Sequence, residues 1–151
     1  MRFRRCLSMV FLTLGVAILG CAFGEIHWSD PLNRNYTLQK SQQRYTELVR
    51  WSEFQKASAF VDPKLRDPYL QQAPSLRELR FTDYESGSVV IDDETGTSTV
   101  EVTYLAYSPW SPIETEIIET QEWYRSNISN NWRVRSSFDG LDKLGLERSG
   151  R

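Results

Sequence analysis

Hydrophobic and polar positions follow three different patterns along this chain. The first is an uncharged run from Cys6 to Gly20, which comes after a basic head at residues 2–5. The second, between Tyr36 and Val61, repeats at helical spacing, and the third, from Leu79 onward, alternates with a period of two. Because these two periods place apolar side chains on one face of a helix and on one face of a strand, they predict helices first and strands afterwards.

Two helices are predicted between Tyr36 and Val61. The first runs from Tyr36 to Trp51 and carries one apolar stripe, as a helix packed on a core does. The apolar positions of that stripe are Leu38, Tyr45, Leu48 and Val49. Ser52 followed by Gln55 fits a capping box and predicts that a second, short helix begins there.

A further helix start is predicted at Asp62-Pro63. Asp at a cap position accepts backbone N–H bonds, and Pro suits the first helical position because its missing N–H has no helical partner there. Pro68 and Pro74 follow closely, and a proline inside a helix removes a hydrogen bond and clashes with the preceding turn. We therefore expect only a turn or two of helix after Asp62.

The first two of four predicted strands follow Pro74. A long strand covers Leu79 to Ile91 and is interrupted by a bulge or bend near Ser86-Gly87-Ser88. A turn at Asp92 to Gly96 leads into a second strand, whose apolar residues alternate with polar ones. The residues on its apolar face are Val100, Val102, Tyr104 and Ala106.

The last two strands, Ile113 to Arg125 and Asn131 to Phe138, follow a break at Ser108 to Pro112, and parity predicts their register. The apolar faces are Ile113, Ile117 and Trp123 on one strand and Trp132, Val134 and Phe138 on the other. Joining them pairs odd with even residues, and the same register sets Glu122 opposite Arg133 or Arg135. Two independent features thus select one register.

Helices followed by a four-stranded antiparallel meander define an α+β domain at residues 36–140, in which a curved sheet packs against the N-terminal helices. In this pattern the chain resembles NTF2-like (cystatin-like) domains. The resemblance rests on the helices of Tyr36–Val61, the bent Leu79–Ile91 strand, and the Glu119–Trp123 strand followed by Trp132-Arg133-Val134. That superfamily includes enzymes with an Asp or His in the cone, ligand carriers and membrane-associated assembly factors, so the resemblance does not choose a function.

The N-terminal run resembles the signal segment of bacterial lipoprotein precursors, because it ends in the lipobox order Ile18-Leu19-Gly20-Cys21. The resemblance implies removal of residues 1–20 and acylation of Cys21 at its sulfur and its new amino end. Two or more acyl chains hold a protein stably on a bilayer. Because Ala22 and not Asp follows, a Gram-negative source would place the protein at the outer membrane, facing the periplasm. Residues 21–35 then form a flexible tether, and residues 141–151 a polar tail.

Two other interpretations of the N-terminal run stay open. Cys6 to Phe23 approaches the ~20 apolar residues that a membrane-spanning helix needs, although Gly15 weakens the distal half as a helix and no basic cluster follows. A soluble secreted protein would need small residues at both key positions before the cut, a site that Ala17 and Cys21 do not form well.

Composition and charge limit the classes of function. Residues 1–20 hold three of the 18 Lys and Arg and none of the 20 Asp and Glu, so the mature chain has 15 basic and 20 acidic residues and no basic stripe for nucleic acid. Cys6 leaves with the signal and Cys21 carries lipid, so no thiol remains for a disulfide, a metal site or a nucleophile. The one histidine, His27, lies in the tether. No catalytic triad, metal or cofactor is predicted.

Glu119 and Gln121 form the candidate site. By parity they face inward between Ile117 and Trp123, where an unpaired carboxylate would be costly to bury. One interpretation is a polar pocket in the cone, with Tyr104 and Trp123 as its aromatic wall. The other is a bulge or an open sheet end that leaves Glu119 and Gln121 in water. A general-base role for Glu119 lacks a second titratable partner.

Two further features have alternative interpretations. Trp110, flanked by Pro109 and Pro112, is either an exposed contact for a partner protein or packs over the sheet edge, and the sequence favours packing. Asp92-Asp93-Glu94 beside Gly96 is either a weak cation site or a solvated hairpin tip. Because the spacing lacks the alternation of a calcium loop, the solvated tip is favoured.

We therefore predict a non-enzymatic lipoprotein that is anchored to the membrane at Cys21 and acts through contacts with envelope proteins. The alternative is a small-ligand-binding module that uses a pocket in the cone. Its lining residues would be Tyr104, Glu119, Gln121 and Trp123. A third hypothesis, a hydrolase or isomerase with Glu119 as base, has the weakest support.

Overall fold

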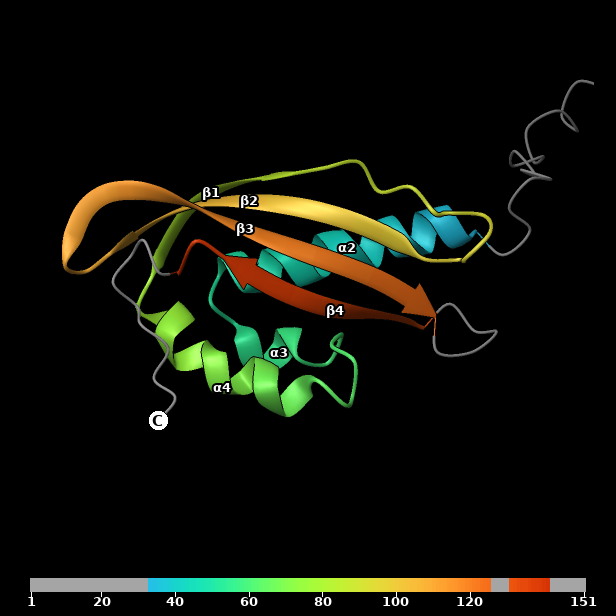
Figure 1. Cartoon of the computed structure of the whole chain (residues 1–151), viewed down its shortest axis with the longest axis horizontal. Helices are drawn as coiled ribbons and strands as arrows, with labels where there is room; N and C mark the ends of the chain where they lie inside the picture. The colour runs from blue at the N-terminus through green and yellow to red at the C-terminus, as the bar shows by residue number, and fades with distance from the viewer. Residues whose placement is uncertain (1–32, 126–130, 142–151) are drawn as a thin grey trace, which may run out of the picture. The chain divides into compact units, whose positions relative to one another are not determined.

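The computed structural model describes residues 33–125 and 131–141 (Figure 1). The helices in this part of the chain are α2 (Arg34–Arg50), α3 (Phe54–Ala57) and α4 (Arg66–Arg77). The strands are β1 (Arg80–Ser86), β2 (Ser98–Ser108), β3 (Ser111–Arg125) and β4 (Trp132–Asp139). They form one antiparallel sheet in the order β1-β2-β3-β4. The α+β class and the four-stranded meander are confirmed, and the NTF2-like assignment stays a prediction.

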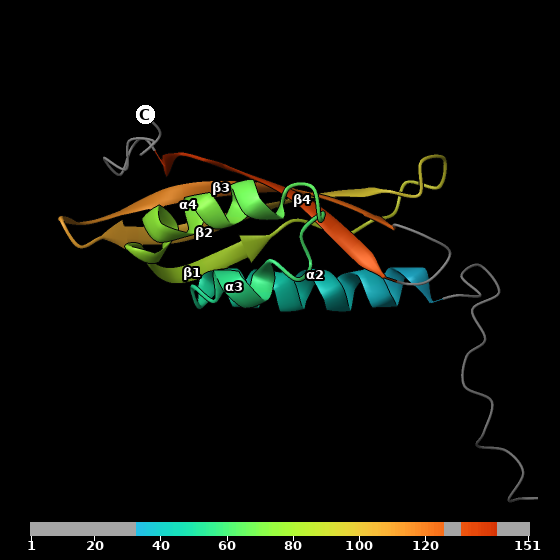
Figure 2. The same ribbon diagram turned by 90° about the horizontal axis from the view of Figure 1, so that it is seen from below.

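The longest described helix, α2, lies along one face of the sheet (Figure 2), which we call the inner face. Its apolar stripe is buried as predicted, with Leu38, Tyr45 and Val49 at 0 % exposure. The helix begins at Arg34, slightly before the predicted domain boundary at Tyr36. Burial of this stripe against the sheet is the main contribution of α2 to the core.

The predicted capping box at Ser52 is wrong, because Ser52 ends α2 and does not begin α3. Its φ is 57°, in the left-handed region. The Ser52 N–H donates to the Val49 carbonyl and the Glu53 N–H to the Leu48 carbonyl, each at 2.8 Å. These are the two bonds of a Schellman motif, in which glycine usually occupies the position of Ser52. The helix that follows, α3, is a single turn of four residues.

The prediction of only a turn or two after Asp62 is also wrong, because α4 is 12 residues long. Pro68 falls in the first turn, where its missing N–H has no helical partner. Pro74 lies inside the helix and does cost a hydrogen bond. The helix continues past it because Tyr69, Ala73 and Leu76 bury one stripe, at 5 %, 2 % and 0 % exposure. Tertiary burial therefore outweighs the local penalty of the proline.

The first strand is shorter than predicted and its irregularity lies elsewhere. β1 ends at Ser86, and its register shift falls between Phe81 and Asp83. Residues 87–91 leave the ladder after the Gly87 N–H has donated to the Glu101 carbonyl at 2.8 Å. Three consecutive apolar residues at 89–91 cannot all face one side of a strand. Accordingly Val90 is 66 % exposed.

The second strand and the turn before it match the prediction. In β2 the residues of the apolar face are at most 1 % exposed, and the residues that alternate with them are exposed or half-buried. In the turn, Gly96 has a φ of 66° and its N–H donates to the Asp92 carbonyl at 2.7 Å. Glycine is favoured at that backbone conformation because it has no Cβ.

The predicted register of the last hairpin is confirmed. Trp123 pairs with Val134, so both apolar faces lie on the inner side, and Glu122 pairs with Arg135 on the outer side. The prediction fails only at Ile113, which is 71 % exposed. The reason is that the β2–β3 hairpin projects past the described helices (Figures 1 and 2), so none of α2, α3 and α4 lies against this end of the inner face.

The opposite end of the sheet holds the start of α2. The Trp132 indole N–H donates to the Thr37 hydroxyl at 3.1 Å, and Trp132 pairs with Arg125 at the last residue of β3. The chain therefore enters the domain beside the end of β3 that is remote from the β2–β3 hairpin.

Several predictions fall on residues that the structure does not describe. They are the signal segment, Cys21, nearly all of the tether, and the tail beyond Leu141. In residues 33–125 and 131–141, no helix has the length and apolar character needed to cross a membrane.

Candidate functional site

The four residues predicted to line a pocket come together on the inner face of the sheet. Glu119 and Gln121 lie on β3, Trp123 follows on the same strand, and Tyr104 lies beside them on β2. All four are at 0 % exposure. The alternative that a bulge or an open sheet end leaves Glu119 in water is therefore wrong.

The carboxyl group of Glu119 accepts hydrogen bonds from four uncharged donors. Its Oε1 accepts from the hydroxyls of Tyr45, at 2.7 Å, and Ser136. Its Oε2 accepts from the Tyr104 hydroxyl at 2.8 Å and from the Gln121 amide at 2.7 Å. The donors come from α2, β2, β3 and β4, so one side chain connects four elements. We call these five residues the Glu119 cluster.

A second layer of polar groups surrounds Gln121. Its amide N–H also donates to the Thr46 hydroxyl at 3.1 Å, and its carbonyl accepts from the Trp123 indole N–H at 3.1 Å. Gln42 donates to the same Thr46 hydroxyl at 3.0 Å and to the Ser86 hydroxyl at 3.0 Å. Because every polar atom of Gln121 has a partner, the buried amide causes no unpaired-group penalty.

Aromatic rings enclose this polar centre. The Tyr45 and Trp123 rings meet edge to face, with centroids 5.7 Å apart. Phe81 packs in the same way against Tyr104, with centroids 5.3 Å apart. Such pairs exclude water, so the hydrogen bonds of Glu119 lie in surroundings of low polarity, where each is electrostatically stronger.

Burial decides the protonation of the cluster. Desolvation raises the pKa of Glu119 above its ordinary value, because its hydrogen bonds only partly offset the cost of a buried charge. Burial also raises the pKa of Tyr45 and of Tyr104, and the nearby charge of Glu119 raises both further. All the hydrogen-bond donors that Glu119 has among the described residues are neutral.

The Glu119 cluster is better explained by a role in stabilising the fold than by a role in binding a substrate. None of the four candidate side chains has surface open to solvent, and the acceptor positions of Glu119 are filled by protein donors. The place predicted for a pocket is thus occupied by side chains that bond to one another. The cluster links α2 to the sheet through the hydrogen bond from Tyr45 to Glu119.

Sequence reasoning missed Tyr45 and Ser136 as partners of Glu119. A signal for both was present. Ser136 has the parity of Trp132 and Val134, which places it on the inner face. In α2, the polar residues Gln42 and Thr46 interrupt the apolar stripe beside Tyr45, and such an interruption on a buried face indicates a polar partner on the opposite layer.

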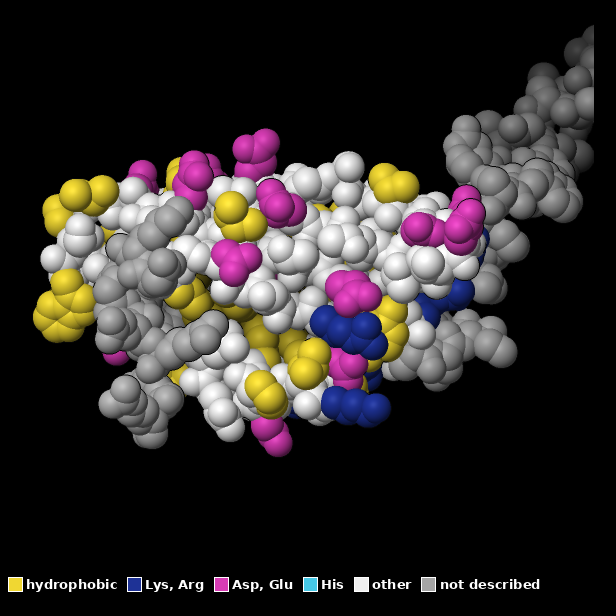
Figure 3. Space-filling model, in the orientation of Figure 1, with side chains coloured by type: hydrophobic (Ala, Val, Ile, Leu, Met, Phe, Trp, Pro, Cys, Tyr) yellow, Lys and Arg dark blue, Asp and Glu magenta, His cyan; other side chains and the backbone are white. Residues whose placement is uncertain are grey.

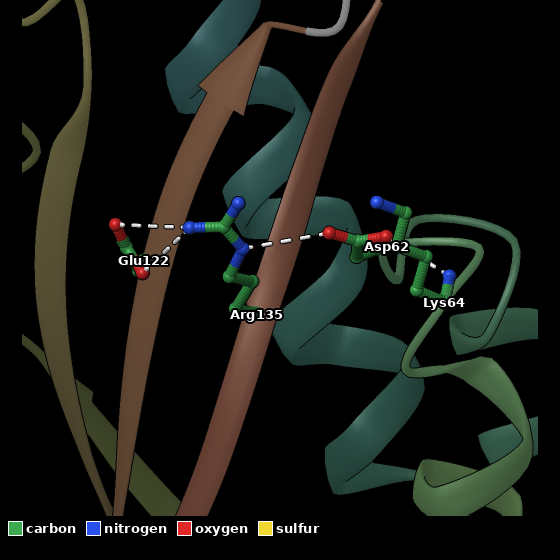
Figure 4. A network of polar contacts seen from close by, with 4 residues as sticks. All are labelled: Asp62, Lys64, Glu122 and Arg135. Carbon is green, nitrogen blue, oxygen red and sulfur yellow. Dashed lines mark hydrogen bonds and ion pairs between the residues drawn. The ribbon is translucent and has the colours of Figure 1, made fainter.

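A separate ion-pair cluster fixes the loop before α4 to β4 (Figure 4). Arg135 contacts Asp62 Oδ2 at 3.4 Å and Glu122 Oε2 at 3.4 Å. Asp62 Oδ1 accepts the Lys64 N–H at 2.9 Å in the turn before α4. The helix start predicted at Asp62-Pro63 is wrong, because α4 begins at Arg66 with Leu65 at its N-cap. A hydrogen bond from Tyr124, followed by that from Lys64, lowers the pKa of Asp62. The ion-pair cluster around Arg135 is therefore explained by its structural role, the attachment of the loop before α4 to β4.

The β2–β3 connection exposes its largest side chain. Trp110 is 83 % exposed, so the favoured prediction that it packs over the sheet edge is wrong. Ile113 beside it is 71 % exposed. We call residues 109–113 the hairpin tip. Figure 3 shows hydrophobic side chains gathered at this end of the molecule.

The turn at Asp92 uses its carboxylate for its own backbone. Asp92 Oδ1 accepts the N–H groups of Glu94 and Thr95 at 2.8 and 2.9 Å. These bonds hold the pKa of Asp92 below its ordinary value. Among the described residues, no three His, Cys, Asp or Glu side chains are grouped so that they could hold a metal ion.

Comparison of the chain with known protein families, curated proteins and solved structures finds no match.

Proposed function

We propose that this chain is a non-enzymatic lipoprotein of the cell envelope, held on the membrane by an acylated Cys21, which acts through contacts with other proteins. For a Gram-negative source the proposed location is the outer membrane, facing the periplasm. An NTF2-like architecture is part of the same proposal. The location is supported by the lipobox resemblance of Ile18-Leu19-Gly20-Cys21.

The exposure of Trp110 at the hairpin tip carries the proposal of protein contacts. An indole that is 83 % exposed gains nothing from the core, and tryptophan is among the residues that contribute most to protein interfaces. Ile113, 71 % exposed, adds aliphatic surface next to it. Two flanking prolines, Pro109 and Pro112, limit the backbone freedom of the tip, so little ordering entropy is lost on binding.

The ligand-binding alternative has less support. A binding site for a small molecule needs polar groups that are free to bond the ligand. In the Glu119 cluster those groups already bond one another, and the candidate residues are at 0 % exposure. A ligand would first have to displace several buried hydrogen bonds.

The anchor is tested by mass spectrometry of the full chain produced in a Gram-negative host. We expect a mature protein that lacks residues 1–20 and carries acyl groups on Cys21. The Cys21→Ser variant is the control, and it should keep its precursor length and lack acyl groups. A wild-type protein with an intact amino terminus, or one without lipid, would contradict the proposed location.

The contact is tested by placing a photo-crosslinking amino acid at Trp110 in the anchored protein. We expect a discrete crosslinked protein in living cells. The matched control carries the same amino acid at Gln71, an exposed position of α4, and should give no discrete product. Identical product patterns from the two positions, or none from Trp110, would count against a role through the tip.

A further inference from the structure

The outer face of the sheet has no helix packed on it in the described part of the chain. The contacts of α2 with the sheet reach inner residues, such as Glu119 and Gln121. On β2 and β3 the outer residues alternate with the buried inner ones and are exposed or half-buried. Figure 3 shows acidic side chains spread over the sheet side of the molecule.

The register places apolar residues between carboxylates on that outer face. One row across three strands reads Asp83, Leu105, Glu116, because Leu105 pairs with both acidic residues. The leucine is half-buried and both carboxylates are exposed.

The neighbouring row repeats the arrangement over four strands. Glu85 pairs with Thr103, Thr103 with Ile118, and Ile118 with Asp139. Its two ends are therefore acidic, and its centre holds Thr103 and the apolar Ile118. Because adjacent rows on one face are about 7 Å apart, Ile118 lies diagonally next to Leu105 of the first row. We call the two rows, with Glu101 and Glu114, the acidic face.

Within the described residues, the carboxylates of the acidic face form no ion pair. Among ion pairs between described residues, none involves Asp83, Glu85, Glu101, Glu114, Glu116 or Asp139. Two described basic side chains come near these rows: Arg80, which lies opposite Tyr107, and Arg50, whose guanidinium donates to the Thr82 carbonyl at 2.7 Å. Like charges gathered on one surface produce a negative potential that a cationic partner relieves.

The acidic face runs into the hairpin tip. β2 leads from Leu105 to Trp110, and β3 leads back through Glu114 and Glu116. The combination matches the two parts of a lysine or arginine side chain: the apolar centre accepts the alkyl stem, and the carboxylates bind the charged head. The exposed face of Trp110 also favours a cation.

We propose that the acidic face and the hairpin tip together bind a basic, amphipathic segment of a partner protein. This rests on the proposed function and names its class of partner. Lys or Arg heads contact the carboxylates, and apolar side chains contact Leu105, Ile118 and Trp110. A bilayer with anionic headgroups is disfavoured as the occupant, because the face carries the same sign of charge.

The test measures binding of a fluorescein-labelled hexapeptide of alternating Lys and Leu to the full acylated chain in a neutral detergent, by fluorescence anisotropy. We expect saturable binding that weakens as salt rises. The Glu101→Gln/Glu116→Gln variant should bind about tenfold more weakly, and Trp110→Ala should also weaken binding. The matched control is Glu47→Gln/Glu53→Gln, which removes the same charge at and just after the C-terminal end of α2 and should bind like the wild type.

Three results would overturn the inference. Equal weakening by both double variants would mean general charge attraction. A Glu-Leu hexapeptide that binds as tightly would mean that charge sign is irrelevant, and anionic vesicles that compete fully with the peptide would mean a lipid surface. The crosslinking at Trp110 separates the two proposals. If the crosslinked product at Trp110 still forms in the Glu101→Gln/Glu116→Gln variant, the proposed protein contact is supported and the basic partner is contradicted. If the peptide binds but no crosslinked product forms, binding of a basic segment is supported and the proposed contact in cells is contradicted.

Discussion

The Glu119 cluster and the hairpin tip depart in opposite directions from the rule that ionisable groups are exposed and large apolar groups are buried. Glu119, an ionisable group, is at 0 % exposure, whereas Trp110 is 83 % exposed. The buried carboxyl is tolerated because four donors reach it from four elements. The exposed indole has no such compensation inside the domain. The fold therefore explains why the carboxyl group is buried. It does not explain why the indole is exposed, and a binding partner would.

The comparison predicts that stability depends on the cluster. Glu119→Ala should lower the free energy of unfolding by about 3–5 kcal/mol, because it leaves buried donors without an acceptor and opens a cavity. Glu119→Gln should cost less, since the amide oxygen still accepts. Urea unfolding followed by tryptophan fluorescence measures both. Glu116→Ala, outward on the same strand, is the control and should change stability by less than about 0.5 kcal/mol. A similarly small loss for Glu119→Ala would contradict the role of the cluster.

The protonation of Glu119 adds a pH dependence with a definite sign. Burial raises its pKa in the folded state, so the folded protein binds a proton that the unfolded chain has already lost. This contribution is complete below the ordinary glutamate pKa of about 4.5 and decreases as pH rises through the folded value. The loss is about 1.4 kcal/mol for each pH unit between the two values.

The measurement is the difference in unfolding free energy between the wild type and Glu119→Gln as a function of pH. Subtracting the variant removes the contributions of other groups, including Asp62, whose lowered pKa works in the opposite direction. The difference should shift against the wild type as pH rises. A difference that does not change with pH, or that shifts in favour of the wild type, would show that the four hydrogen bonds of Glu119 outweigh its desolvation.

The ion pairs of Arg135 are less buried than Glu119 and less exposed than Trp110. Their loss should therefore change the free energy of unfolding by an intermediate amount. The Asp62 side chain is 11 % exposed and that of Arg135 is 48 % exposed, so solvent screens the pair in part. A double-mutant cycle with Asp62→Ala and Arg135→Ala should give a coupling of about 0.5–1 kcal/mol. The pair with Glu122, 45 % exposed, should couple more weakly. The reverse order would mean that burial does not set these energies.

Removal of the exposed side chains should have the smallest effect. Trp110→Ala and Ile113→Ala should each change the free energy of unfolding by less than about 0.5 kcal/mol, because neither residue contributes to the core. Thermal unfolding followed by circular dichroism detects a larger change. A loss above about 1 kcal/mol would show that the tip packs on its own domain, and the contrast with Glu119 would then disappear.

The parts of the fold that the sequence predicted correctly depend on local periodicity. The register of β3 with β4 followed from parity, and the charge pair of Glu122 with Arg135 supported it independently. α4 was underestimated because the penalty of Pro74 is local, whereas the burial of Leu76 that offsets it is tertiary. Ser52 was assigned to the wrong helix because Ser followed three residues later by Gln is typical of an N-cap, and no local pattern indicated the left-handed backbone that ends α2 at Ser52.

The candidate site was predicted only in part for the same reason. Strand parity placed Glu119 and Gln121 on the inner face, which the structure confirms. It could not show what lies against them, because Tyr45 is 74 residues away in the chain. Nor could parity show that the hairpin extends past the helices, and this leaves Ile113 exposed despite its inward position.

The length of β3 gives the domain a long axis with unlike ends. Its 15 residues, at about 3.3 Å each, cover about 50 Å of extended chain between the place where the chain enters the domain and the projecting indole. The two ends of this axis differ in character, because α2 begins at one and the exposed Trp110 lies at the other. A partner that binds the indole would therefore contact the domain far from the point where its first described helix begins.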